Sequence, residues 1–163
     1  MNTTTPKTFR IFPFLISLVI TLAIGFVASL VTRPQIAGWY NTLVKPSFNP
    51  PPRLFAPVWT AIYIMIGVAA YIVWQRRDNS KTYKITAAIY VSQLAFNFLW
   101  SMVFFGLHGI LSALFVILLL WVSIILNIRW FKKYNKTAAW LLVPYLLWVS
   151  FASILNLSIY LLN

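Results

Sequence analysis

Five long apolar runs separated by short polar segments restrict the fold of this 163-residue chain more than any other feature. Each run is close to the roughly 20 residues that an α-helix needs to cross the hydrocarbon core of a bilayer. A chain of this length normally forms a single domain. We therefore predict one all-α integral membrane domain over residues 1–163, a five-transmembrane-helix bundle with spans at about 11–32, 54–75, 85–105, 110–128 and 137–162.

The charged residues favour a membrane protein over a soluble or nucleic-acid-binding one. Only 9% of the residues are charged, and thirteen Lys and Arg stand against a single acidic residue, Asp78. Nearly all of these charges lie between the apolar runs, as in loops at an anionic membrane surface. No segment joins a basic patch to exposed aromatic side chains for base stacking, so we expect no nucleic-acid partner.

Prolines and basic residues together predict the loops and the orientation. Residues 33–53 contain Pro34, Pro46 and three consecutive prolines, which predict a proline-rich loop between the first two spans because proline interrupts helices. Lys and Arg concentrate in loops that stay cytoplasmic. One side of the predicted bundle carries ten basic residues, Lys7 and Arg10 among them, and the other carries three. We expect a multi-pass protein of the cell membrane with a cytoplasmic N-terminus.

Several kinds of chemistry are disfavoured by the residue types alone. The chain has no cysteine, one His108 and one Asp78, which cannot supply the three or four ligands of a metal site. Asp78 and His108 fall in loops on opposite sides, so they cannot form a hydrolytic triad. No span carries an Asp or Glu, the group on which proton-coupled exporters ordinarily rely. We predict no metal site and no conventional catalytic residues.

Three spans carry stripes that mix aromatic, amide and small residues at three- and four-residue spacing, which places each stripe on one helix face. Such faces suit a pocket for a flat, largely apolar ligand, and they equally suit helix packing or an interfacial aromatic belt. The stripes are Trp59, Tyr63, Gly67, Ala70 and Trp74 on the second span, Gln93, Asn97, Trp100 and Phe104 on the third, and Pro144, Trp148, Ala152 and Asn156 on the fifth.

Two further groups of residues have simpler interpretations. The first span carries Ser17, Thr21, Gly25 and Ser29 at four-residue spacing, which favours close helix packing. His108, Lys45 and Arg53 fall on the predicted outer side, where they are candidates to pair with an acidic ligand head. The alternatives are a solvated turn for the histidine and lipid phosphates for the two cations.

The order and spacing of many motifs resemble the TspO/MBR family of tryptophan-rich sensory proteins. That family is related to the mitochondrial translocator protein, once called the peripheral-type benzodiazepine receptor. The resemblance covers about residues 11–163, and the departures point to a bacterial-type member. The motifs are Gly38-Trp39-Tyr40, Leu43, Lys45-Pro46, Pro50-Pro51, Val58-Trp59, Tyr63, Gly67, Gln93, Leu94, Asn97, Trp100-Ser101, Phe104 to Gly106, Pro144-Tyr145, Trp148, Phe151-Ala152 and Leu155-Asn156.

The resemblance implies a membrane receptor, sensor or carrier that binds porphyrins such as protoporphyrin IX in a cavity between its helices. Isoquinoline carboxamides and benzodiazepines are further ligands of the family, homodimers are common in it, and no obligatory cofactor is implied. Porphyrin propionates would be the acidic heads for Lys45, Arg53 and His108. The cavity lining that the resemblance implies is Tyr40, Trp59, Tyr63, Asn97, Trp100, Trp148 and Ala152.

Other functions stay open at this point. The resemblance also implies that some members break down protoporphyrin IX in light, which would involve Trp59 and Trp148, and a scaffold for other membrane proteins is a third possibility. Sterol binding is doubtful, because Tyr160 is followed by no basic residue that would complete the family's sterol pattern. Relatives occupy outer membranes as well, so the host membrane is not determined.

Overall fold

The computed structural model describes residues 8–163, and Lys7, counted above among the N-terminal basic residues, lies outside them. Five helical segments are long and apolar enough to cross a membrane, which confirms the predicted fold class. The chain runs through α1 (Ile11–Ala37), α2 (Trp39–Thr42), η1 (Pro52–Leu54), α3 (Phe55–Trp74), α4 (Lys81–Ser101), η2 (Met102–Gly106), α5 (Ile110–Tyr134), α6 (Lys136–Trp140) and α7 (Val143–Leu162).

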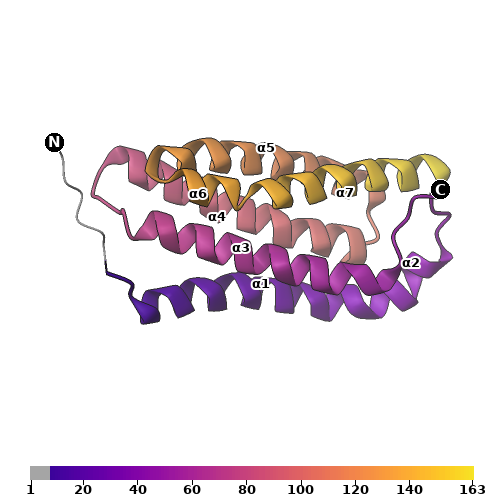
Figure 1. Ribbon diagram of the computed structural model, residues 1–163. Helices are drawn as coiled ribbons and strands as arrows, with labels where there is room; N and C mark the ends of the chain where they lie inside the picture. The colour runs from indigo at the N-terminus through magenta and orange to yellow at the C-terminus, as the bar shows by residue number, and fades with distance from the viewer. Residues whose placement is uncertain (1–7) are drawn as a thin grey trace.

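The five spans form an elongated bundle that closes on itself (Figure 1). Helix α1 packs against α3, α3 against α6, α6 and α7 against α5, α5 against α4, and α4 back against α1. The N-terminal end of α1 and the α3–α4 and α5–α6 connections lie at one end of the bundle. The short helix α2, the proline-rich loop and the C-terminus lie at the other. A cavity, described below, lies between α1, α3, α4 and α7 toward the end of the bundle that carries α2 and the C-terminus.

Small and hydroxyl residues bring α1 and α3 close together. The Ser17 hydroxyl donates to the Gly67 carbonyl oxygen at 2.7 Å, and the Thr21 hydroxyl donates to the Tyr63 carbonyl oxygen at 2.9 Å. These bonds require close backbone approach, which small residues allow inside a membrane. The predicted packing role of this part of the first span is therefore confirmed. We call this contact the α1–α3 seam.

The first helix is longer than predicted. We expected it to end at Thr32, because proline removes a backbone donor and clashes with the preceding turn. Instead α1 continues through Pro34 to Ala37, and the Gly38 N–H then donates to the Pro34 carbonyl oxygen at 3.1 Å. Neighbouring groups inside a membrane bundle can compensate for the lost bond, so proline there does not end a helix. The extension keeps Arg33 and Ile36 on the helix.

Two local irregularities in the helices shape the region around this cavity. The fifth span is divided into α6 and α7 just before Pro144, because proline has no N–H to continue a helix and is tolerated only in the first turn of a new one. The fourth span follows α4 after a π-helical turn, η2, in which the Leu107 N–H donates to the Met102 carbonyl oxygen at 3.0 Å. Such turns often accompany functional sites. Here the turn directs Phe104 and Phe105 into the bundle.

Candidate functional site: an aromatic cavity between the helices

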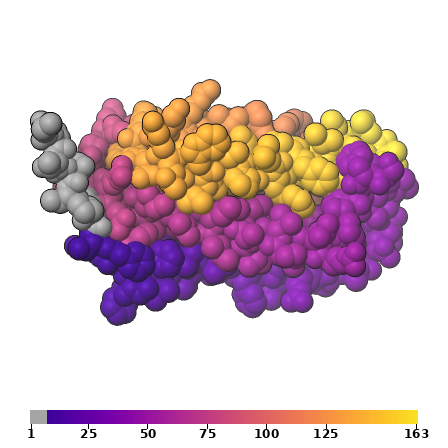
Figure 2. All heavy atoms as spheres, viewed as in Figure 1, coloured from indigo at the N-terminus to yellow at the C-terminus, as the bar shows by residue number. Residues whose placement is uncertain are grey.

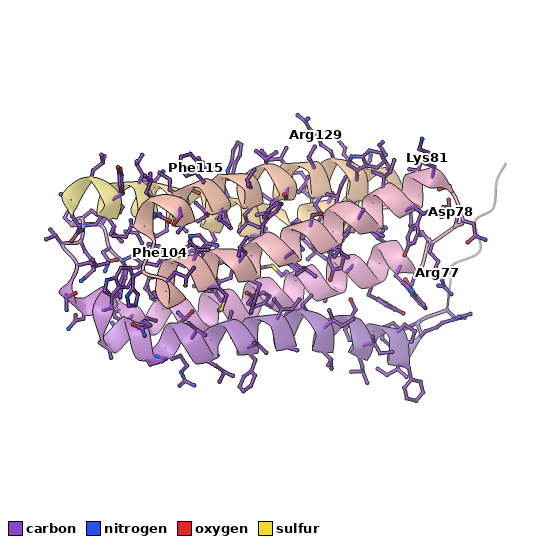
Figure 3. All side chains as sticks on the ribbon, turned by 180° about the vertical axis from the view of Figure 1, so that it is seen from behind. Arg77, Asp78, Lys81, Phe104, Phe115 and Arg129 are labelled. Atoms are coloured by element: carbon purple, nitrogen blue, oxygen red, sulfur yellow. The ribbon has the colours of Figure 1, made fainter. Side chains whose placement is uncertain are left out.

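A cavity of about 130 Å³ lies between α1, α3, the end of α4 with η2, and α7. It occupies the half of the bundle that contains α2 and the C-terminus, as the position of Phe104 in Figure 3 indicates, whereas Arg77 and Asp78 mark the opposite end. Most of the lining is apolar, and its aromatic members are Tyr40, Phe55, Trp59, Tyr63, Trp100, Phe104, Phe105, Trp148 and Phe151.

The aromatic walls are built from rings that pack on one another. Trp59 lies at the centre, with its ring 5.7 Å from that of Tyr63 and 6.4 Å from that of Trp100. Trp100 in turn stacks on Phe104 at 5.7 Å. On the opposite wall Trp148 contacts Phe151, with ring centroids 5.6 Å apart. Centroid separations of about 4.5–7 Å are those of favourable aromatic pairs, so these walls are held in place before any ligand arrives.

Asn97 lies behind the wall rather than in it. The Tyr63 hydroxyl donates to Asn97 Oδ1 at 2.5 Å, and Asn97 Nδ2 donates to the Tyr145 hydroxyl at 2.9 Å. Asn97 is 1% exposed and does not line the cavity. The Asn97 amide therefore fixes the ring of Tyr63, which does line the cavity. Tyr63 would separate Asn97 from a ligand in the cavity.

Asn156 is the amide that reaches the lining. Its Oδ1 accepts from the Trp100 indole N–H at 3.2 Å, and its Nδ2 donates to the Ile110 carbonyl oxygen at 2.9 Å. The predicted site did not include Asn156, although the stripe on the fifth span contained it at the right spacing. The bond to the indole holds Trp100 in the orientation that forms one wall.

The three predicted outer cations do not line the cavity in the described structure. Lys45 Nζ donates to the carbonyl oxygens of Tyr40, Asn41 and Leu43 at 2.9, 3.2 and 2.8 Å, so it holds the loop together. His108 stacks on Trp39 with ring centroids 4.3 Å apart, and its Nε2 lies 3.1 Å from Gln35 Oε1. Arg53 is exposed on η1.

Arg33 is the cation that lines the cavity among the described residues. Because α1 continues through Pro34, Arg33 occupies the next four-residue step after Gly25 and Ser29, both of which also line the cavity. Sequence reasoning assigned Arg33 to the loop. Extending the four-residue ladder by one step would have found it.

The cavity lining reaches the surface of the bundle on α1 and on α3. Arg33 on α1 and Ala56 on α3 both line the cavity and are both exposed at the bundle surface. Deeper in the membrane the α1–α3 seam closes the gap. A molecule that entered from the bilayer between these two helices would pass Arg33.

The proline-rich loop covers the end of the cavity. Tyr40 is 4% exposed, lines the cavity, and donates its hydroxyl to Asn49 Oδ1 at 2.6 Å. Asn163 then ties the loop to the end of α7, because it accepts from the Val44 N–H at 2.9 Å and donates to the Val44 carbonyl oxygen at 3.0 Å. In Figure 2 the purple loop lies against the yellow end of α7. The loop is thus anchored as a lid at both ends.

The fold and the cavity define a class: five-helix membrane proteins with an aromatic cavity beneath a proline-rich lid. Comparison with known proteins gives the particular family, since a model of the TspO/MBR family matches residues 17–162. The chain therefore belongs to the TspO/MBR family.

Individual relatives agree with this assignment. The tryptophan-rich protein TspO of Archaeoglobus fulgidus is 44% identical over 148 residues, which are 90% of this chain and 94% of the relative. The protein of the same name from Chlorobaculum tepidum is 44% identical over 142 residues, 87% of this chain and 90% of the relative. The translocator protein of Bos taurus is 34% identical over 133 residues, covering 81% and 79% of the two chains.

The Asn97 network gives a stability prediction. Asn97→Leu should leave the hydroxyls of Tyr63 and Tyr145 buried without their amide partner, at a cost of about 1–3 kcal/mol. The free energy of unfolding, measured by denaturant titration in mixed micelles, checks this value. Asn127→Leu is the matched control, because Asn127 is 1% exposed and its Oδ1 has no hydrogen-bond partner within residues 8–163.

The control should be neutral or stabilising, since it removes an unsatisfied polar atom. Adding Tyr63→Phe and Tyr145→Phe to Asn97→Leu should restore much of the loss, because it also removes the two unpaired hydroxyls. Equal losses in Asn97→Leu and Asn127→Leu would contradict a specific role for the network.

Proposed function

We propose that the protein is a membrane sensor or carrier whose cavity binds a flat, largely apolar tetrapyrrole such as protoporphyrin IX. Membership of the TspO/MBR family supports the sensor or receptor role. The observation that carries the ligand class is a cavity with aromatic walls and one arginine at its mouth. Ring faces provide stacking surfaces, and few polar groups are needed to orient such a ligand.

Arg33 is suited to the acidic part of a porphyrin. A guanidinium can bind a carboxylate through two parallel hydrogen bonds, and the contact is stronger where water is scarce. We therefore propose that a propionate lies at the mouth beside Arg33, with the macrocycle directed toward Trp59 and Trp148. This replaces Lys45, Arg53 and His108 as the preferred partners of the propionates.

The size of the cavity sets a condition on binding. Its volume of about 130 Å³ is below the roughly 300–1,000 Å³ of typical ligand pockets. It is closer to the roughly 150 Å³ cavity that holds benzene in an engineered protein. A macrocycle therefore enters only if α1 and α3 separate at the mouth or the lid moves. We propose that the C-terminal part of α1, beyond the α1–α3 seam, makes this movement.

Tryptophan fluorescence tests the proposal directly. Protoporphyrin IX titrated in the dark into the purified chain should quench the emission saturably. Trp59→Phe and Trp148→Phe should each weaken binding by about 3- to 10-fold, because each indole face contributes on the order of 1 kcal/mol to stacking. Trp140→Phe is the matched control, since Trp140 is 71% exposed on α6 and does not line the cavity.

Arg33→Gln adds a second readout to the same titration. It should weaken binding of the diacid and leave binding of the porphyrin dimethyl ester unchanged, because the ester has no anionic carboxylate. Quenching that never saturates would contradict the porphyrin proposal, as would an equal loss of porphyrin affinity in all three tryptophan variants.

The same protein samples also test two alternative functions, porphyrin breakdown and a scaffold role. Light-dependent breakdown of the porphyrin is favoured by the position of Trp59 and Trp148 on the cavity lining. Illumination of the complex in air, followed by absorption spectroscopy, tests it, and product formation that persists in the double Trp→Phe variant would exclude these side chains. A scaffold function predicts instead that filling the cavity leaves the cellular role intact.

We also propose that the N-terminal end of the bundle faces the cytoplasm and that the chain forms homodimers. The orientation is supported by the basic residues at that end, which include Arg76, Arg77, Lys81 and Lys84. Because the chain has no cysteine, a single introduced Cys in the α3–α4 connection reports the orientation by its labelling with a membrane-impermeant thiol reagent. Cross-linking in intact membranes tests the dimer.

A further inference from the structure

A second site lies at the end of the bundle opposite the aromatic cavity. The segment before α1, the end of α3 and the start of α4 surround an open hollow of about 680 Å³. Arg10, Arg77 and Lys84 supply its cations, and we call this hollow the basic bowl. In Figure 3 Arg77 lies at this end of the bundle, remote from Phe104 at the aromatic cavity.

An apolar groove continues from the basic bowl along the bundle. It encloses about 350 Å³ between α1, α3 and α4, and Trp74 and Tyr83 line both the bowl and the groove. Its remaining lining is mostly apolar, with hydroxyls from Ser17, Tyr71, Thr86 and Tyr90 among side chains such as Pro13, Ile16, Ile20, Ala70 and Ala87. A polar, basic hollow thus adjoins a mostly apolar groove, with Trp74 and Tyr83 shared between them.

The start of α1 is fixed against α3 in a way that sets one wall of the bowl. The Tyr71 hydroxyl accepts from the Arg10 backbone N–H at 2.8 Å. The rings of Phe9 and Phe14 pack edge-on against Tyr71, with centroids 5.6 and 5.3 Å away. These contacts hold Arg10 beside the end of α3.

The charges around the bowl favour an anion. Arg77 lies over the ring of Trp74, 3.8 Å from its centroid, so its planar group is held at the boundary between bowl and groove. Asp78 is the acidic residue here, and its Oδ1 accepts from the backbone N–H and the hydroxyl of Ser80. The carboxylate keeps its charge, so the three cations and one anion of the bowl lining give it a formal net charge of +2.

We propose that this site binds an anionic glycerophospholipid, with the phosphate in the basic bowl and one acyl chain in the groove. Basic pockets between membrane helices attract anionic head groups, and arginine is suited to phosphate. A zwitterionic lipid carries its own cation and gains less from three basic side chains. A soluble phosphate lacks the chain that the groove accommodates.

Lipid retention by the full chain tests the proposal. The purified protein is equilibrated with equal amounts of phosphatidylglycerol and phosphatidylcholine, and native mass spectrometry counts the lipids that remain bound. The parent should retain phosphatidylglycerol preferentially. The triple variant Arg10→Gln, Arg77→Gln, Lys84→Gln should lose this preference by roughly tenfold or more, because each basic residue near an anionic head group contributes to the attraction.

The matched control is Arg129→Gln, Lys132→Gln, Lys133→Gln. It removes the same charge at the C-terminal end of α5, and Arg129 projects outward from the bundle in Figure 3. The preference of this control should stay within about twofold of the parent, because its cations do not line the bowl. Equal losses in the two triple variants would show diffuse surface attraction and overturn the proposal, as would equal retention of both lipids by the parent.

The groove is tested without changing charge. Ala87→Phe fills the groove and should lower phosphatidylglycerol retention, whereas Ala88→Phe places the same ring on an exposed position beside it and should not. If glycerol phosphate displaces the lipid and Ala87→Phe has no effect, the bowl is a plain phosphate site and the lipid proposal is wrong. A melting temperature close to that of the parent confirms that each variant is folded.

Discussion

Ala152→Trp is expected to abolish porphyrin binding while the bundle stays folded. Ala152 is 9% exposed on α7 and lines the cavity, so a larger side chain there extends into the empty space. An indole is of the same order of size as the cavity volume of about 130 Å³. The ring would occupy the space between Trp59 and Trp148. We expect the affinity to fall by about 100-fold or more, which corresponds to nearly 3 kcal/mol.

The measurement is the dark porphyrin titration, with thermal unfolding of the same sample as the check on folding. Filling a cavity commonly raises stability, so the melting temperature should stay level or increase. Ala61→Trp is the control, because Ala61 lies on the exposed face of α3 and does not line the cavity. If Ala152→Trp folds poorly, Ala152→Leu gives a smaller filling and should weaken binding in proportion. Unchanged affinity in both would place the ligand elsewhere.

Gly67→Leu should be strongly destabilising. A Cβ at Gly67 would lie 2.9 Å from Leu18 Cδ2 and from Thr21 Oγ1, and 3.2 Å from Leu18 Cα. The last contact is with the backbone, so a change of rotamer cannot relieve it. The helices must separate, which breaks the hydrogen bonds of the α1–α3 seam. We expect a loss of roughly 3–5 kcal/mol in the free energy of unfolding.

A graded series tests this prediction even if Gly67→Leu does not fold. Gly67→Ala should cost about 1–3 kcal/mol, the range for overpacking in a core. Gly106→Ala is the matched control, because a Cβ there meets Val31 Cγ1 at 3.4 Å, an ordinary contact. It should be nearly neutral. Similar costs for the two alanine variants would mean that helix propensity, and not the α1–α3 seam, sets the effect.

Much of the fold follows from hydrophobic run length, because each span must satisfy its own backbone inside lipid. Helix periodicity then identified the sides of the second and fifth spans that face inward, where Trp59, Tyr63, Trp148 and Ala152 line the cavity. Pro34 was misjudged because a rule from soluble helices was applied to a membrane helix. That one error also moved Arg33 from the mouth of the cavity into a loop.

The spacing of residues in the sequence did not predict how deep in the bundle a side chain lies. Asn97 and Asn156 both belong to the predicted stripes, yet one lies behind Tyr63 and the other reaches the lining. Periodicity reports the direction in which a side chain points. It does not report whether a neighbouring helix places another ring in front of it, since that depends on tertiary packing. The lining implied by the family resemblance included Asn97 and left out Asn156, whereas the cavity in the structure is lined by Asn156 and not by Asn97.

Arg33 and Ala56 line the cavity and are exposed at the bundle surface, and ligand entry beside them would change what concentration means for this protein. A ligand that enters between two helices arrives from the hydrocarbon phase by diffusion in two dimensions. Its occupancy then follows its mole fraction among the lipids, and not its molarity in the surrounding buffer. An apparent dissociation constant should rise in proportion to the amount of detergent or lipid present, because added amphiphile dilutes the ligand. Affinities of different ligands are comparable only after correction for how strongly each one partitions into the bilayer.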